Sequence, residues 1–192
     1  MTCIKLNYRL FINPMMVNKM NVILDLDETL INTHKRSKFT SKHFKRATLF
    51  YHKPMEDKYI VIARPGLDAF LDWLFTKFIV TIWTAASQPY ALFIVKHFII
   101  NKNHRVPLYI FSSDHCMVSI KHGTSHKDLK ILFKLFPEQF NPKNTIIVDD
   151  REDICENQPN NSYCIKPFLF LSSKSYQDQE LSELRNFLEN YS

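Results

Sequence analysis

The fold of this chain is decided by the stretch NVILDLDETL, residues 21–30. Residues 22–24 form a continuous apolar run, which is typical of a strand buried on both faces of a parallel sheet. The run ends abruptly at Asp25 and Asp27. Their two-residue spacing sends both carboxylates away from the strand in the same direction. This pattern predicts a polar site at the end of a buried strand.

Asp25 and Asp27 are two acids at the end of a strand that is predicted to be buried, and this placement needs a physical explanation. Burying carboxylates is costly unless a cation or hydrogen-bond donors compensate. Mg²⁺ would compensate, because it prefers oxygen ligands in octahedral geometry. An ionised Asp25 beside such an ion can attack a phosphorus atom, and Asp27 can protonate the leaving oxygen and later activate water. The ordinary alternative is a capped turn after a strand, and the apolar strand with DLDETL after it makes that alternative weaker.

Outward from this stretch, strands and helices alternate. Further short apolar runs predict strands at residues 59–63, 79–83, 145–148, 163–165 and 168–171. Helical spacing of apolar residues occurs at residues 67–74, 89–100, 129–136 and 180–189. Residues 106–120 are expected to form short strands around a turn. The alternation predicts an α/β, Rossmann-like fold with a mainly parallel sheet flanked by helices. Ligands of such sheets bind beyond the carboxyl ends of the strands.

Three more positions at predicted strand or helix ends carry suitable chemistry. Thr84 follows the run at 79–83 and can donate a hydrogen bond to a phosphate oxygen, although a hydroxyl there is also an ordinary helix cap. Ser125 and Asp128 resemble a capping box, which would place Lys127 in the first turn of a helix. A cation is disfavoured at that end of the helix dipole, at a small cost that a surface lysine can tolerate, and a nearby phosphate would give Lys127 a reason to be there.

Asp149 and Asp150 follow the apolar run at 145–148. Adjacent carboxylates repel each other without a cation, and with Asp25 and Asp27 they make four acids at strand ends. One shared metal ion is the simplest explanation. Unrelated polar loop residues are the alternative, which the coherent order of the motifs disfavours.

Bulk properties limit the class of protein. The chain has 192 residues, of which 45% are hydrophobic and 23% charged, so it can bury a core and favours a single domain. We expect residues 1–19 to be an N-terminal extension and residues 20–192 to be one domain. The formal net charge of +6 suits anionic partners but equally suits a basic surface. The four cysteines form no CxxC pair, which indicates reduced thiols in an intracellular protein. We expect no membrane span.

Taken in order, the motifs resemble those of the haloacid-dehalogenase superfamily. They are DLDETL at 25–30, RPGLDAFL at 64–71, WTAAS at 83–87, HKDL at 126–129 and IIVDDRED at 146–153. The chain is similar in particular to the branch that contains RNA polymerase II C-terminal-domain (CTD) phosphatases of the small and TFIIF-associating types. Glu28, where many superfamily members have glycine, is typical of this branch. The resemblance covers roughly residues 20–170.

The resemblance implies a role for each matched position. Asp25 would be the nucleophile that forms an aspartyl-phosphate, and Asp27 the general acid and base. Thr84 and Lys127 would bind the phosphate, and Asp149 would pair with Lys127. Mg²⁺ would be held by Asp25, Asp150 and the main-chain carbonyl of Asp27. The implied fold has a small β insertion and no large cap domain.

The chain also departs from the branch. Relatives carry an arginine before the lysine motif that reads the phosphopeptide, and residues 111–116 contain none. His115, Lys121 or His122 are the candidates to replace it. The short insert at 34–64 leaves an open site, which suits phosphoserine or phosphothreonine in a protein such as the polymerase CTD.

Two alternatives of other classes remain: a small-molecule or nucleic-acid-end phosphatase of the same fold, and a non-catalytic phosphoprotein-binding module. Nucleic acid is possible but not expected as a partner. The residue bias and compact size suit a protein of a large DNA virus, soluble inside the cell, in either nucleus or cytoplasm. The sequence does not predict an oligomeric state.

Overall fold

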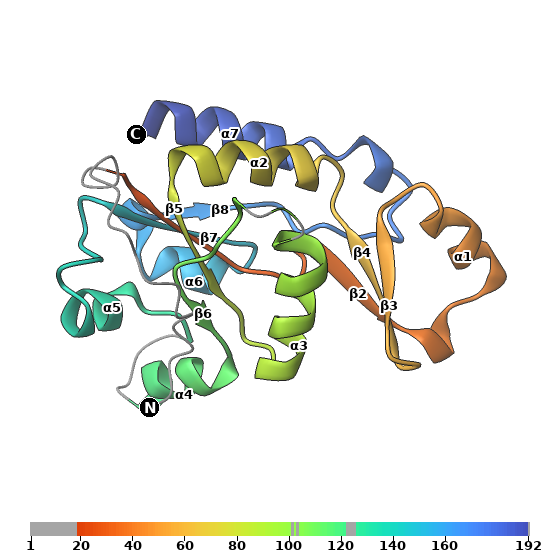
Figure 1. Cartoon of the computed structure of the whole chain (residues 1–192), viewed down its shortest axis with the longest axis horizontal. Coiled ribbons are helices and arrows are strands. Elements are labelled where there is room, and N and C mark those ends of the chain that lie inside the picture. The colour runs from red at the N-terminus through yellow and green to blue at the C-terminus, as the bar shows by residue number, and fades with distance from the viewer. Residues whose placement is uncertain (1–18, 101, 103, 122–125, 192) are drawn as a thin grey trace.

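The computed structural model describes residues 19–191 apart from 101, 103 and 122–125. Its centre is a five-stranded sheet in the order β6-β5-β1-β7-β8, in which every pair is parallel (Figure 1). The strands are β1 (Asn21–Leu24), β5 (Ile79–Trp83), β6 (Ile110–Phe111), β7 (Thr145–Asp149) and β8 (Ser162–Cys164). The predicted parallel sheet is therefore confirmed, with the DLDETL strand at its middle.

Helices cover both faces of this sheet, because alternate residues of the central strands point to opposite sides. Val22 and Leu24 of β1 pack in one core, and Ile23 packs in another. The first core is covered by α2 (Leu67–Lys77), α3 (Gln88–Ile94), the π-helix Val95–Ile99 that continues α3, and α7 (Glu180–Tyr191). The second is covered by α4 (Ser113–Lys121), α5 (Leu129–Leu135) and α6 (Glu152–Glu156). The predicted α/β layering is confirmed.

The β insertion is a separate small sheet beside the main one (Figure 1). It has the antiparallel order β2-β4-β3, formed by β2 (Ile31–Lys35), β3 (His52–Met55) and β4 (Tyr59–Ala63). The 3-10 turn Arg36–Lys38 and helix α1 (Ser41–Ala47) lead from β2 to β3. We did not expect α1 and β3, since their segment is polar and basic without periodicity. Two further 3-10 turns, Pro159–Asn161 and Ser175–Gln177, complete the elements.

Two strand predictions were wrong. Residues 106–120 form only the short strand β6 followed by helix α4, because Ser113 and Asp114 begin a helix where we expected a turn. Residues 168–171 are not a strand. Their alternating aromatic side chains do bury Phe168 and Phe170 against the small sheet. Their backbone N–H groups, however, bond to the Glu28 carbonyl and the Asn32 side chain, so no strand pairing follows.

Most of the predicted N-terminal extension, residues 1–18, lies outside the described part of the chain. In the remainder, no helix has both the length and the apolar character needed to cross a bilayer.

Candidate active site

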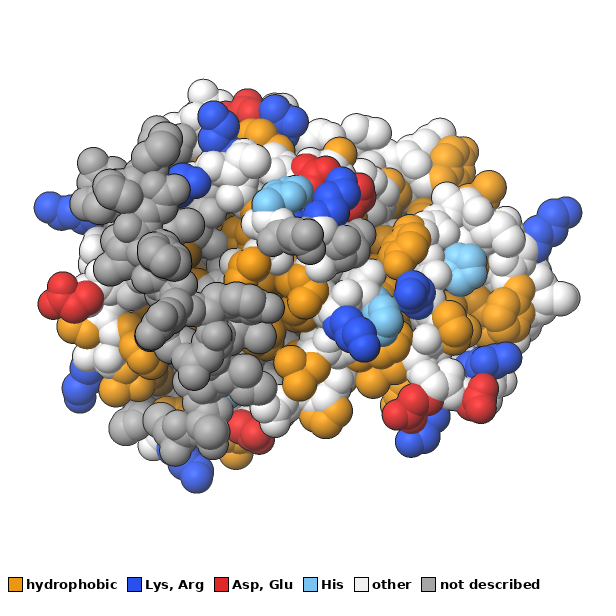
Figure 2. Space-filling model, viewed as in Figure 1, with side chains coloured by type: hydrophobic (Ala, Val, Ile, Leu, Met, Phe, Trp, Pro, Cys, Tyr) orange, Lys and Arg blue, Asp and Glu red, His pale blue; other side chains and the backbone are white. Residues whose placement is uncertain are grey.

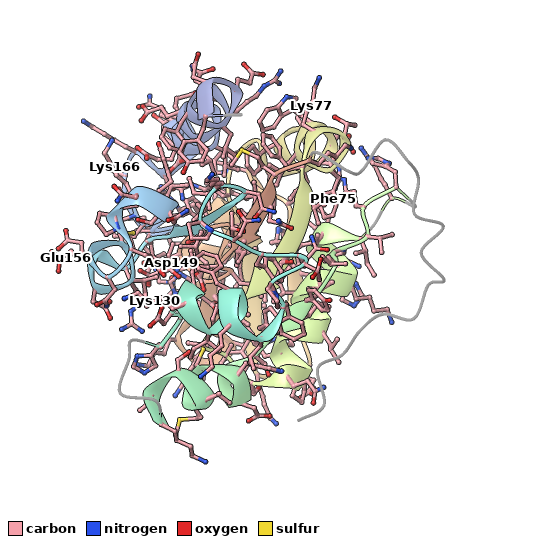
Figure 3. All side chains as sticks on the ribbon, turned by 90° about the vertical axis from the view of Figure 1, so that its left-hand side faces the viewer. Phe75, Lys77, Lys130, Asp149, Glu156 and Lys166 are labelled. Carbon is pink, nitrogen blue, oxygen red and sulfur yellow. The ribbon has the colours of Figure 1, made fainter. Side chains whose placement is uncertain are left out.

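The candidate site lies at the carboxyl ends of β1, β5 and β7. Parallel register places Leu24 beside both Ile82 and Val148, so the residues that follow these strands meet at one edge of the sheet. Asp25 and Asp149 are thereby brought together, as the sequence predicts. Figure 3 shows Asp149 inside the ribbon, whereas the charged side chains of Glu156 and Lys166 lie at the periphery.

Lys127 joins the two acids. Its buried ammonium donates hydrogen bonds to Asp25 Oδ1 and, at 2.7 Å, to Asp149 Oδ2. Burial alone would lower the pKa of Lys127, but the carboxylates of Asp25 and Asp149 outweigh it and raise the pKa. Lys127 therefore stays protonated and holds a fixed positive charge between two buried acids.

The prediction that Lys127 lies in the first turn of a helix was wrong, although Lys127 does lie at the candidate site. Helix α5 begins at Leu129, and its N-cap is Asp128, whose side chain accepts from the Lys130 N–H. Lys127 thus precedes the helix, and Ser125 of the expected capping box lies outside the described residues. The two carboxylates on its ammonium account for a cation at this place.

Gln158 fixes the backbone around Lys127. Its amide donates to the Lys127 carbonyl at 3.0 Å, and its side-chain oxygen accepts from the Leu129 N–H at 3.0 Å. A second donor bond, to the Ile154 carbonyl, anchors the amide to α6. Sequence patterns did not reveal Gln158, because its partners lie 29 and 31 residues away along the chain.

We expect Gln158→Ala to lower the free energy of unfolding by about 1–3 kcal/mol, because it leaves buried backbone groups without partners. Urea unfolding followed by circular dichroism measures the change. Asn157→Ala is the control, since Asn157 is exposed and its one side-chain bond, to the Asp153 carbonyl, stays within α6 and its C-cap. Equal losses in the two variants would contradict the assigned role of Gln158.

Three carboxylates form an acidic cluster at the site. Ligand oxygens of Asp25, Asp149 and Asp150 lie within 4.8 Å of one another. Burial, partly opposed by Lys127, raises the pKa of Asp25 to about 7, and the Asp149 charge adds to the rise. Burial and the Asp149 charge also raise the pKa of Asp150, whose Oδ1 accepts from the Thr29 hydroxyl at 3.3 Å. One lysine does not neutralise three acids, so their oxygens fit a hard divalent cation.

Asp27 leaves this cluster and faces helix α3. Its carboxylate accepts a hydrogen bond from the Tyr90 hydroxyl at 2.5 Å, and that hydroxyl lies 2.5 Å from Thr33 Oγ1. Burial raises the pKa of Asp27, which Tyr90 and Thr33 partly offset. Asp27 is therefore bonded to Tyr90 and not to Lys127, and its raised pKa suits it to hold and release a proton. The sequence predicted Asp27 but gave no signal for Tyr90 or Thr33.

Thr84 lies where the sequence predicts, buried just after β5. Its hydroxyl accepts from the Ala86 N–H at 3.1 Å, and its own N–H donates to the Phe111 carbonyl. The hydroxyl proton is thus directed by the turn and can be donated to an anion at the edge of the sheet.

Arg64, from the RPGL motif, holds the loop that carries the acids. Its guanidinium bonds to the Thr29 carbonyl at 2.8 Å, the Lys166 carbonyl at 2.7 Å and both oxygens of Asp178. The side chain is fully buried. The same loop contains Glu28 with a positive φ of 62°, a conformation uncommon for residues other than glycine. Arg64 therefore stabilises this strained loop through hydrogen bonds to the Thr29 and Lys166 carbonyls.

His115 does not reach the acidic cluster. Its Nδ1 accepts from the Ser112 N–H at 3.0 Å, its ring packs on Phe111, and it lines a small apolar pocket of about 100 Å³. Lys121 is exposed at the last turn of α4, and His122 lies outside the described residues. The proposed replacement of an arginine by His115 is therefore not supported by this geometry.

Comparison with known proteins gives a consistent match. A family model described as NLI interacting factor-like phosphatase matches residues 20–192. A CTD phosphatase-like protein of Invertebrate iridescent virus 6 is 40% identical over 179 residues, covering 89% of this chain and 98% of that protein. One of Invertebrate iridescent virus 3 is 36% identical over 183 residues, covering 88% and 95%. Both sources are viral, which agrees with the viral origin that the sequence suggests.

Among solved structures, Fcp1, described as an essential RNA polymerase II CTD phosphatase, matches with a TM-score of 0.60. The match is 20% identical and covers 90% of this chain but 51% of that one, so this chain spans about half of its length. At this identity the similarity concerns the fold alone, and it agrees with the predicted α/β architecture.

Proposed function

Because this chain belongs to the NLI interacting factor-like phosphatase family, we propose that it is a magnesium-dependent protein phosphatase that acts through an aspartyl-phosphate on Asp25. Its proposed substrates are phosphoserine and phosphothreonine in an extended segment of a protein, with the CTD of RNA polymerase II as the first candidate. The observation that carries the proposal is Lys127, held between Asp25 and Asp149 beside a third carboxylate.

The residues of the site divide the steps of the proposed reaction among them. Asp25 attacks phosphorus, and the bond from phosphorus to the serine oxygen breaks. Asp27 gives its proton to that oxygen, then takes a proton from the water that hydrolyses the aspartyl-phosphate. Lys127 and the Thr84 hydroxyl donate to the phosphoryl oxygens. Asp25, Asp150 and the Asp27 carbonyl would hold Mg²⁺, which supplies positive charge that offsets the charge of the phosphoryl group.

A substrate panel tests the proposal. The wild-type protein with Mg²⁺ is compared on phosphoserine peptides, on 3′-phosphorylated oligonucleotides and nucleotides, and on an aryl phosphate. We expect the highest kcat/KM on the peptides. A preference for nucleotides or oligonucleotide ends would favour the alternative phosphatase of the same fold. Phosphopeptide binding without turnover in excess Mg²⁺ would favour a binding module.

Removing the metal is expected to stop turnover. Excess EDTA should lower aryl phosphate hydrolysis to the background rate, because Lys127 alone does not offset the acids at the site, and added Mg²⁺ should restore it. Asp150→Asn should raise the Mg²⁺ concentration for half-maximal activity roughly tenfold or more. Asp153→Asn is the matched control, since this neighbouring acid is exposed and paired with Arg151. Full activity in EDTA would refute the metal requirement.

Tyr90→Phe tests how Asp27 is held. Without the hydroxyl, the Asp27 carboxylate loses the bond that aims it, and we expect kcat to fall about tenfold with little change in KM. Steady-state kinetics on an aryl phosphate measures both constants. Tyr163→Phe serves as a control, because Tyr163 is also half-buried but packs on Phe187 away from the acids. A normal kcat for Tyr90→Phe would show that Asp27 needs no such support.

A further inference from the structure

Helix α3 and its π-helical continuation contact one face of the small sheet, next to Asp27. Antiparallel pairing places Thr33, Val61 and Lys53 in one row across β2, β4 and β3, so their side chains share a face. Helix α3 and its π-helical continuation cover this row, with Tyr90 at the Thr33 end and His97 at the Lys53 end. We call the exposed margin of this face, from Tyr90 to Lys53 and His97, the α3 shelf.

The far end of the shelf carries basic groups. Lys53 Nζ lies 3.4 Å from His97 Nδ1, and both side chains are half-buried. Lys96 is exposed one residue away. Burial, together with Lys53 and Lys96, lowers the pKa of His97, so its neutral ring accepts from Lys53. Figure 2 shows basic and histidine side chains among hydrophobic ones between α3 and β3.

In the described part of the chain, these basic groups have no carboxylate in an ion pair with them. Within residues 19–191, excluding the gaps, neither Lys53 nor His97 forms an ion pair with a carboxylate. The nearest acids along the chain, Glu56 and Asp57, lie in the β3–β4 turn and pair with Lys58 and Arg36. A half-buried lysine without a carboxylate, placed on a face that leads to the site, is suited to an anion from outside.

The distance from Thr33 to Lys53 determines how many peptide residues would lie between the phosphoserine and a second anionic residue. Thr33 and Lys53 are separated by two strand spacings, about 10 Å at roughly 4.8 Å each. An extended peptide advances about 3.3 Å per residue, so about three residues span the distance. Side chains of an extended peptide alternate between its two faces, so a phosphoserine beside Asp25 and Asp27 would be accompanied by a side chain about two to four residues away that reaches Lys53.

We infer that Lys53, with His97 and Lys96 beside it, forms a second anion subsite that selects substrates with another phosphorylated or acidic residue about three positions from the phosphoserine that is hydrolysed. This inference rests on the proposed function and adds a substrate preference to it. Lys53 acts on binding and takes no part in the chemistry at Asp25.

The test uses phosphoserine peptides with alanine, aspartate or a second phosphoserine about three residues away on either side. Lys53→Met removes the charge and keeps most of the apolar stem. Lys58→Met is the matched control, since Lys58 lies in the β3–β4 turn of the same small sheet and is exposed beside Glu56. Both kcat/KM and the affinity of each peptide for the inactive Asp25→Asn protein are measured, and hydrolysis of an aryl phosphate reports on the unchanged site.

We expect the wild type to prefer the doubly charged peptides and Lys53→Met to lose about five- to tenfold on them, with the alanine peptide and the aryl phosphate unaffected. Peptide turnover with equal constants for all peptides, or equal losses in Lys53→Met and Lys58→Met, would overturn the subsite and leave the proposed function standing. Lys53-dependent binding of doubly charged peptides without their hydrolysis would support the subsite and overturn the protein phosphatase activity.

Discussion

Asp25→Asn is expected to lower kcat by roughly 10⁴-fold or more while the protein remains folded, as is typical when a covalent nucleophile is removed. The asparagine amide occupies nearly the same volume but does not attack phosphorus. The loss should be severe for peptides and for an aryl phosphate alike, because both need the same attack by the Asp25 carboxylate on phosphorus. Initial rates in excess Mg²⁺ measure it.

The stability of this variant separates chemistry from folding. Asp25 is buried beside Asp149 and Asp150, and its pKa is raised to about 7 mainly by burial. Removing its charge relieves repulsion, while Lys127 keeps its 2.7 Å bond to Asp149. We therefore expect Asp25→Asn to unfold at the same or a higher urea concentration than wild type in EDTA. Asp114→Asn, an exposed acid on α4, should keep full activity. Substantial turnover by Asp25→Asn would contradict the proposed mechanism.

The sequence predicted those residues of the site that lie at the carboxyl ends of buried parallel strands. Asp25 and Thr84 follow buried strands and Asp149 ends one, and the carboxyl ends of parallel strands meet at one edge of the sheet. Apolar runs are easy to recognise in sequence, so the strands and the residues after them could be located. Lys127 was found through a motif, even though the helix predicted around it begins two residues later.

The residues that the sequence missed act across long distances in the chain. Tyr90 reaches Asp27 over 63 residues, and Arg64 reaches Asp178 over 114 residues. No local pattern encodes such contacts, because Tyr90 fits an ordinary helix and Arg64 an ordinary turn. Helix α4 was missed for a different reason: the apolar residues of β6 just before it suggested a hairpin, and its buried side chains are few. Side-chain networks thus required the structure, as did α1, β3 and α4, whereas the central parallel strands did not.

Lys127→Met is expected to destabilise the metal-free protein by about 3–5 kcal/mol, the range for breaking a buried ion pair from one side. The substitution keeps an apolar stem of similar length but leaves Asp25 and Asp149 without their shared partner. Activity should also fall severely, since no ammonium remains to meet the phosphoryl group. Lys130→Met is the control, because Lys130 is exposed on α5.

The pH dependence of this loss identifies its electrostatic origin. Burial raises the pKa of Asp25, and Lys127 opposes that rise. Without Lys127 the folded protein binds a proton at Asp25 more tightly than the unfolded chain does, whose aspartates titrate near about 4. Unfolding then releases protons, so the free energy of unfolding of the variant, relative to wild type, increases as pH falls from about 8 towards about 5.

Urea unfolding in EDTA across this pH range measures that recovery, and repetition in Mg²⁺ provides a second test. A cation bound by the acids of the cluster would replace part of the lost charge, so Mg²⁺ should stabilise Lys127→Met more than wild type. The double variant Lys127→Met/Asp149→Asn should regain stability, because one of the two unpaired acids is gone. A deficit independent of pH, of Mg²⁺ and of Asp149 would assign the loss to packing, and would contradict a site built around one lysine shared by two aspartates.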